Sequence, residues 1–404
     1  MSPRRTKNSA LRRLVFGLGI AQLVSWAALI YSIAVLGAPM AIDLGVSETA
    51  IFGAFSFSLV VTGLCSPRVG KLIDRIGGRP VLTLGSLVAA ISLAAVAIAP
   101  TLIPFVLVWG LAGVARAMSL YEAAFATLSQ HAAKSFRKSV TAITLTGGLA
   151  GSVAFPLSLI GLERFGWRWT LLGFATAELL ICLPLYLWCI PAGPGTRVRV
   201  AIQDGASKPA STRRVPPIVF VALATSFALT AFITSAMSVH VINLLKTAGL
   251  TIASAVMVAS LIGPMQVVGR IVEFAFGRRF SSRAIGAATL VLMVISLVAL
   301  MFVNAQIAVA IFFAICFGWA NGVQTIVRGT VPAELFGHGD YGHLMGRLAF
   351  PSFIARAVAP IALTLSGSSV LGLDLSVPLL GCVALLALAA YVIAIRSVRA
   401  VDAA

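Results

Sequence analysis

Four ionisable side chains stand out because they lie inside long apolar runs of the sequence: Arg116, Glu122, Glu178 and Arg356. A charged group in the interior of a bilayer costs at least a few kcal/mol unless it is paired or hydrated. Each of these residues is therefore a candidate for binding a charged or polar solute, or for ion coupling. Arg116 and Arg356 either contact an electronegative group of the solute or neutralise carboxylates of the helices.

Glu122 is the first candidate for proton coupling. A buried carboxyl group can hold a proton, and a conformational change that alternately exposes it would release that proton on either side of a membrane. A permanent salt bridge is the competing interpretation, because buried charges are usually paired. On one continuous helix Arg116 and Glu122 would lie about 120° apart around the axis, so both cannot point at the same solute.

Polar and aromatic side chains recur at helical spacing in several apolar runs. Spacings of three or four residues align Gln22 with Trp26 on one helix face, and Asn321 with Gln324 on another. The further polar or aromatic candidates are Tyr31, Tyr121, His240 and Asn243. Together they would suit a planar solute with hydrogen-bonding edges, although a single aromatic residue in a membrane helix is more often a packing residue. His240 lies near the end of its run, where a hydrated histidine needs no special role.

Two short polar segments share one pattern of glycine, carboxylate and arginine. The first contains Gly70, Asp74, Arg75, Gly78 and Arg79, and the second contains Gly269, Glu273, Gly277 and Arg278. Corresponding positions are separated by a constant offset, which indicates an internal repeat. Glycine permits close helix approach and tight turns, and the carboxylate can pair with arginines or with a helix amino terminus. We therefore predict that these segments latch one conformation.

The elements that carry these residues are predicted to be membrane-spanning helices. The 404 residues are 59% hydrophobic and 10% charged, which excludes an ordinary water-soluble domain. Continuous apolar runs of about 20 residues or more, without alternation, indicate helices rather than barrel strands. We predict twelve spans near residues 14–38, 49–67, 81–99, 102–129, 139–163, 169–190, 216–245, 252–272, 284–303, 307–330, 345–367 and 376–395. The predicted fold class is an all-α membrane protein.

The basic residues indicate how the chain is divided and oriented. Most of the 30 Lys and Arg lie in loops on one side of the predicted spans. The net charge of +18 therefore reflects membrane topology rather than nucleic-acid binding. This distribution predicts that both termini are cytoplasmic. Residues 191–215 form a basic linker rich in Pro, Gly and Ser between an N-terminal six-helix half, 1–190, and a C-terminal half, 216–404. The first span reads as a retained signal anchor.

The first polar segment and the twelve-span layout closely resemble the major facilitator superfamily, in its bacterial twelve-helix form. The resemblance implies two pseudo-symmetric six-helix halves around a central cavity lined by the first, fourth, seventh and tenth helices. It places Glu178 on a peripheral helix, where we expect only a local hydrogen bond, and Arg356 on a helix that flanks the cavity. The glycine-proline signature of drug/proton antiporters is absent from the fifth helix, which lowers the expectation of multidrug efflux.

The resemblance implies a secondary active transporter of the bacterial cytoplasmic (inner) membrane, working by alternating access. Our first interpretation is uptake of a planar, vitamin-like compound such as riboflavin, with protons as the coupling ion. The alternative is efflux of a drug-like compound or of a metalloid such as arsenite, although the five cysteines are scattered along the chain. We expect a monomer in the lipid bilayer with no cofactor, no metal site, no catalytic residues and no nucleic-acid partner. A third hypothesis is a transporter-like sensor that binds the solute but does not transport it.

Overall fold

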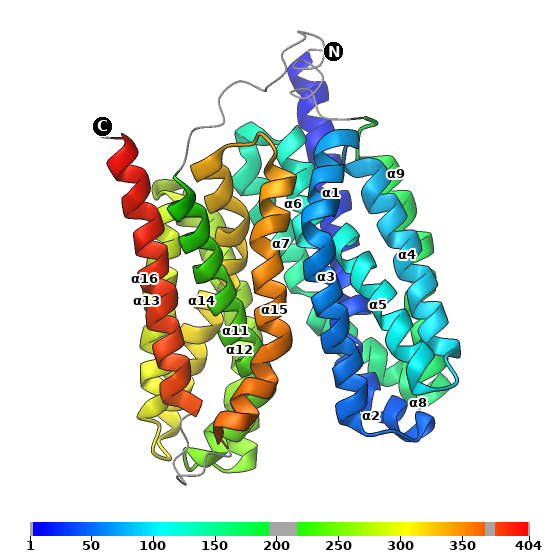
Figure 1. Ribbon diagram of the computed structural model, residues 1–404, viewed down its shortest axis with the longest axis vertical. Helices are drawn as coiled ribbons and strands as arrows, with labels where there is room; N and C mark the ends of the chain where they lie inside the picture. Colours follow the sequence, from blue (N-terminus) through cyan, green and yellow to red (C-terminus); the bar gives the residue numbers. More distant parts are fainter. Residues whose placement is uncertain (1–2, 194–215, 368–375, 403–404) are drawn as a thin grey trace. The chain divides into compact units, whose positions relative to one another are not determined.

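A computed structural model describes residues 3–193, 216–367 and 376–402 of the chain (Figure 1). Every regular element in these ranges is helical, which confirms the predicted all-α fold class. Most of the predicted linker, 191–215, lies outside the described residues. The described ranges contain 11 helical segments long and apolar enough to cross a membrane. The longest of them, Ala133–Cys189, contains the span predicted at 139–163 and all but the last residue of the span predicted at 169–190.

The chain divides into two compact units. The first unit consists of Met1–Thr212 and Gly337–Phe350, and the second of Arg213–Phe336 and Pro351–Ala404. The first unit contains α1 (Pro3–Trp26), η1 (Ala27–Tyr31), α2 (Ile33–Leu44), α3 (Glu48–Ile76), α4 (Gly78–Ile98), α5 (Leu102–Ser119), α6 (Tyr121–His131), η2 (Ala133–Ser135), α7 (Phe136–Gly148), α8 (Ala150–Ala177), η3 (Glu178–Cys182) and α9 (Leu183–Cys189). The second contains α11 (Pro217–Thr247), α12 (Ile252–Phe276), η4 (Gly277–Arg279), α13 (Ser282–Met301), α14 (Ile307–Phe336) and α16 (Ser376–Asp402). Helix α15 (Tyr341–Gly367) begins in the first unit and continues in the second.

Hydroxyl side chains and glycines set where the helices begin and end. The Ser47 and Ser281 hydroxyls accept the amide hydrogens of residues three positions later, at the starts of α3 and α13. Gly77 ends α3 at a φ of 88°, which a residue with a Cβ rarely adopts. Gly166, at a φ of 80°, makes the turn inside the segment described as α8. This turn separates the predicted fifth and sixth spans.

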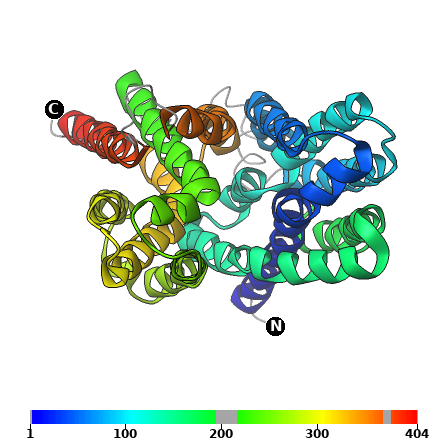
Figure 2. The same ribbon diagram turned by 90° about the horizontal axis from the view of Figure 1, so that it is seen from below.

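Equivalent helices pair in the same way within each unit. In the first unit α5 packs against α3 and α4, and in the second α14 packs against α12 and α13. Figure 2 shows the helices of the two units from below. Glycines bring the backbones together: Gly113 of α5 faces the Ser58 carbonyl of α3, and Gly322 of α14 faces the Gln266 carbonyl of α12. This shared packing extends the sequence repeat beyond the two polar segments.

Several predicted spans are interrupted, and two of these interruptions affect candidate residues. The span predicted at 102–129 corresponds to the apolar segment Leu102–His131, but it is not one unbroken helix, because Leu120 has extended backbone angles and separates α5 from α6. The argument that placed Arg116 and Glu122 about 120° apart assumed an unbroken helix and therefore does not hold. The first span contains the π-helical turn η1, which adds a residue to the turn and changes the direction of the side chains that follow.

Candidate functional site

The first polar segment binds the amino terminus of α15. The Asp74 carboxylate accepts the backbone amide hydrogens of Gly342, at 3.0 Å, and His343, at 2.7 Å. These amides belong to the first turn of α15, where they have no partner inside the helix. A carboxylate at this position is stabilised both by charge-assisted hydrogen bonds and by the helix dipole. Of the two partners predicted for Asp74, arginines or a helix amino terminus, the structure shows a helix amino terminus.

Close backbone contact explains two glycines of this segment. The Cα of Gly70 lies against the carbonyl group of Gly342, so a Cβ at position 70 would collide with backbone. A Cβ at Gly78 would likewise collide with Thr127 of α6. The two arginines of the segment, Arg75 and Arg79, are exposed and half-buried respectively. The glycines therefore serve close packing, and the carboxylate serves the cap.

The second polar segment has different partners. A Cβ at Gly269 would lie 2.9 Å from the Trp319 carbonyl oxygen of α14, so this glycine also permits close helix approach. Its neighbour Arg270 is buried and donates from Nε to the Gly322 carbonyl oxygen at 3.2 Å. Glu273 is buried, and Gly277 begins the short helix η4. The side chain of Arg278 lies outside the described residues.

An aromatic cluster joins α1, η1, α6 and α8 in the first unit. The ring of Trp26 lies 4.8 Å from Tyr121 and 6.2 Å from Tyr31, measured between ring centroids. Tyr31 also meets Phe155 edge-on at 5.7 Å, and Tyr121 stacks on Phe125 at 5.4 Å. The structure therefore brings together the three aromatic residues predicted for the site. Phe125 and Phe155 extend the cluster and were not predicted, because aromatic residues in membrane helices carry no distinctive signal.

Two polar atoms beside this cluster have unused hydrogen-bonding capacity. Gln22, one turn before Trp26, is fully buried and donates from Nε2 to the Ser119 carbonyl at 2.6 Å. Among the described residues, Gln22 Oε1 and Trp26 Nε1 have no hydrogen-bond partner. A buried polar atom left unsatisfied costs about 1–3 kcal/mol. One is an acceptor and the other a donor.

Arg116 is held inside the first unit. Its side chain is 1% exposed, donates from Nε and Nη2 to the Leu29 carbonyl oxygen at 3.0 and 2.6 Å, and donates from Nη1 to the Ser58 hydroxyl. The guanidinium also lies over the rings of Phe55 and Trp109. Leu29 belongs to the π-helical turn η1. Arg116 thus fastens this turn to α3 and α5, which is a structural role.

Glu122 occupies a different environment at the start of α6. Its side chain is half-buried and interacts electrostatically with Tyr341, the first residue of α15. Tyr341 is fully buried and packs edge-on against Phe136 at 5.3 Å. The carboxyl group therefore lies in the same part of the first unit as the α15 terminus that Asp74 caps.

The candidates of the second unit do not form one cluster. Gln324 is buried and donates to the Thr289 hydroxyl at 2.9 Å, which ties α14 to α13. His240 is half-buried and within 3.0 Å of the Pro360 carbonyl oxygen, whereas Asn243 is exposed. Asn321 is half-buried on α14. The guanidinium of Arg356, also half-buried, lies over the Phe353 ring.

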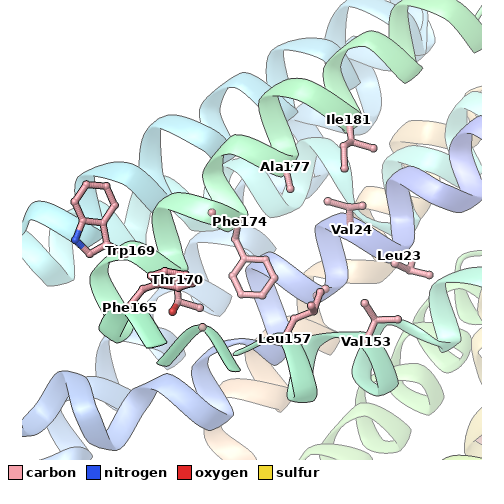
Figure 3. A pocket seen from close by; sticks show the side chains of 13 residues that line it. Leu23, Val24, Val153, Leu157, Phe165, Trp169, Thr170, Phe174, Ala177 and Ile181 are labelled. Atoms are coloured by element: carbon pink, nitrogen blue, oxygen red, sulfur yellow. The ribbon is translucent and has the colours of Figure 1, made fainter. Parts of the chain in front are cut away.

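Two features of the first unit were not predicted as functional. An apolar groove of about 600 Å³ lies between α1 and α8, lined by Leu23, Phe165, Phe174 and neighbouring side chains (Figure 3). Its residues resemble any other lipid-facing surface in sequence, so no pattern could have indicated it. The second feature is Glu178, which is fully buried in η3. Its charge in an apolar run was the available signal.

The fold and these contacts define a multi-pass helical membrane protein with a repeated polar segment and an internal aromatic cluster. Residues 18–280 match the family model of the Major Facilitator Superfamily. The chain belongs to this superfamily, and it is a transporter in class, as its solved structural neighbours are.

Three proteins of known name are similar to this chain. A curated relative is the fujikurins efflux protein of Gibberella fujikuroi, 25% identical over 302 residues. That match covers 73% of this chain, and the chain spans 63% of the relative's length. The human organic anion transporter MFSD10 (TETRAN) matches with a TM-score of 0.75 and 18% identity, over 97% of this chain and 100% of the other. The proton:xylose symporter XylE matches with a TM-score of 0.71 and 15% identity, over 95% of each. At these identities the two solved structures show the shared fold.

Proposed function

We propose that the protein is a secondary active transporter that carries a planar organic solute by alternating access, with riboflavin as the first solute to test. The observation that supports this proposal is the aromatic cluster of Trp26, Tyr31 and Tyr121 beside two unpaired polar atoms. Aromatic rings bind a flat solute by stacking, and the free acceptor of Gln22 and donor of Trp26 would hydrogen-bond its edges. Rotation of the half-buried Tyr31 would admit the solute.

The proposed setting is the inner membrane of a bacterium, with both termini in the cytoplasm and the chain acting as a monomer. The asymmetric distribution of Lys and Arg supports this orientation. The six-helix halves at 1–190 and 216–404 are the proposed moving parts. Asp74 and the start of α15 form a latch that must open in each cycle, since the proposed motion changes the helix packing at this point.

Glu122 is the proposed coupling residue, with protons as the driving ion. Its half-buried position beside Tyr341 would let a change at the α15 terminus alter its contact with water. Glu122→Gln should then abolish proton-driven accumulation and spare counterflow, which needs no net proton movement. Intact accumulation by this variant would show that Glu122 does not couple.

Efflux is the second candidate function, because the curated relative from Gibberella fujikuroi is named for it. A drug-like compound with an aromatic ring would use the same cluster. The binding residues would be unchanged and only the direction of net transport would differ. Direction is therefore a separate measurement from solute identity.

The test is transport of labelled riboflavin by purified protein in proteoliposomes at low external concentration. We expect accumulation under an inward proton gradient, and its loss on addition of a protonophore. Trp26→Leu removes a stacking surface worth about 0.5–1.5 kcal/mol and should weaken binding by roughly 2- to 12-fold. The matched control is Trp188→Leu, whose side chain is 53% exposed, and it should leave binding unchanged.

Other outcomes would overturn parts of the proposal. Binding without any exchange would indicate a sensor rather than a transporter. Export under the same gradient would replace uptake by efflux. Absence of both binding and transport by well-folded protein would remove riboflavin as the solute.

A further inference from the structure

Glu178 is a carboxyl group enclosed within the first unit. It begins the π-helical turn η3, and its side chain has no exposed surface. In the described part of the chain, neither of its carboxyl oxygens has a hydrogen-bond partner. The helices packed against η3 are α1, α4, α8 and α9. Glu178 is thus closed off by protein on every side.

The groups nearest to Glu178 are uncharged. Ser25 of α1 and Cys182 of η3 lie beside the carboxyl group but do not meet the geometric criteria for a hydrogen bond to it. The Oγ atom of Ser25 and the Sγ atom of Cys182 lie 3.7 Å from each other. Cys182 is also 3.7 Å from the Ala21 carbonyl oxygen, to which its thiol donates. The hydroxyl of Tyr186, on α9, is buried and has no acceptor among the described residues. These residues form a small polar cluster inside an apolar unit.

No described basic side chain neutralises this carboxyl group. The titratable groups that act on Glu178 are Cys182 of the same turn and Tyr186 of α9, both of which are neutral when protonated. The basic side chains described on the helices packed against η3 are Arg12 and Arg13 of α1, Arg79 of α4, and Arg164 and Arg168 of α8, all of which lie near helix ends or turns. An ionised carboxylate without a neighbouring cation costs several kcal/mol in an apolar interior. The enclosure therefore favours the neutral acid.

The backbone at Glu178 offers a way to uncover the group. A π-helical turn holds one residue more than an α-helical turn, and such turns occur frequently at functional sites. Conversion of η3 to regular α-helix would rotate its side chains by about 100°. The apolar groove lies directly outside this turn, since Ala177 and Ile181 contribute to its lining. A rotation of this size would thus turn Glu178 away from Ser25 and Tyr186.

We propose that Glu178, with Ser25, Cys182 and Tyr186, forms a second proton-binding site, in which the carboxyl group is the proton carrier. The site is distinct from Glu122, which is half-buried and interacts with Tyr341. In the proposed transport function, on which this part of the inference rests, the proton of Glu178 is exchanged when η3 changes its helical form. Binding of the proton itself does not depend on which solute is carried.

The test of proton binding is infrared spectroscopy of the purified, lipid-embedded protein at neutral pH. The carbonyl band of a protonated carboxylic acid should be present in the wild type and lost in Glu178→Gln. The control is Glu163→Gln, which makes the same replacement at an exposed carboxyl group of α8 and should leave the band unchanged. If Glu178→Gln leaves that band intact and removes a carboxylate band instead, Glu178 is ionised and the inference is wrong.

A second variant guards against a folding defect, although glutamine matches the shape of the neutral acid. Glu178→Asp keeps the acid but moves it by one methylene group, so the carbonyl band should shift rather than disappear. An unshifted band would show that it arises from another residue and would overturn the assignment.

Transport then tests the coupling role separately. Glu178→Gln should lose proton-driven riboflavin accumulation while keeping counterflow, whereas Glu163→Gln should keep both. Normal accumulation by Glu178→Gln would overturn coupling through this site. If the wild type itself does not carry riboflavin, the proposed solute fails, while the infrared measurement still decides whether Glu178 binds a proton.

Discussion

The two copies of the polar segment share their spacing but differ in what they hold. In the first copy, Asp74 caps the amino terminus of α15, a helix that belongs to both units. In the second, Arg270 donates to the Gly322 carbonyl of α14, which lies wholly in the second unit. The carboxylate that binds the start of α13 comes instead from Glu334, near the end of α14.

This difference indicates that one repeated pattern supports two kinds of contact. The glycines keep the same task in both copies, since Gly70 and Gly269 each lie against a backbone carbonyl of a neighbouring helix. Asp74 caps a separate helix, whereas Arg270, which corresponds to Lys71 of the first copy, links α12 to α14. The contact of Asp74 with the start of α15 is the one proposed above as the latch.

The largest expected effect comes from Gly70→Ala. The new Cβ would collide with the Gly342 carbonyl, and backbone cannot move aside as a side chain can. Overpacking of this kind costs about 1–3 kcal/mol, or roughly 5- to 150-fold in an equilibrium. We expect a loss of that size in the initial rate of riboflavin counterflow. Gly53→Ala on the same helix, where a Cβ meets nothing within 4 Å, should transport normally, and equal rates for the two variants would contradict the latch.

Asp74→Asn should have a smaller effect. Asparagine keeps one acceptor oxygen but loses the charge and turns an amide donor toward the α15 amides, so the cap weakens by about 1–2 kcal/mol. Counterflow should slow because the latched state becomes less populated, while the dissociation constant for the solute stays unchanged. Separate measurements of binding and rate check this, and a variant that binds poorly would place Asp74 in the solute site instead.

Glu334→Gln should affect stability and leave transport intact. Glu334 accepts from Arg283 at 2.7 Å and from the Ser282 amide at 3.0 Å, and the ion pair is partly exposed. Such a pair contributes about 1 kcal/mol or less. The expected result is a lower melting temperature with an unchanged counterflow rate. A strong transport defect would mean that the start of α13 also moves in the cycle.

Ser281→Ala tests the smallest contribution. The exposed Ser281 hydroxyl caps α13 by accepting the Ala284 amide hydrogen at 3.2 Å, whereas the equivalent start of α4 follows Gly77 without a side-chain cap. Loss of this cap costs about 0.5–1 kcal/mol. A small fall in melting temperature is expected, with no change in transport, and an effect larger than that of Glu334→Gln would reverse the order proposed here.

The sequence predicts the fold well because apolar length alone defines membrane spans. The repeat also predicts that Gly70 and Gly269 allow close packing, since glycine serves that purpose wherever backbones meet. The break at Leu120 was missed because no glycine or proline marks it. The turn at Gly166, by contrast, is marked in the sequence, because glycine is the residue that most readily adopts the positive φ found there.

Specific partners are harder to predict than helices. Asp74 was expected to bind arginines or a helix terminus, but its actual partner lies more than 200 residues away in the chain. Arg116 was a candidate for the solute, yet it bonds to the Leu29 carbonyl of a π-helical turn that sequence patterns do not show. Glu178 was set aside for its peripheral helix, although the helices packed against that turn enclose it completely.

Hydrogen exchange at the start of α15 tests most directly whether the first copy alone caps this helix. The amides of Gly342 and His343 donate to Asp74, so they should exchange slowly in the wild type. A loss of about 1–2 kcal/mol in Asp74→Asn should speed their exchange by roughly 5- to 30-fold. Glu273→Gln should leave the same amides protected. Unchanged protection in Asp74→Asn, or equal loss in both variants, would contradict this difference between the two copies.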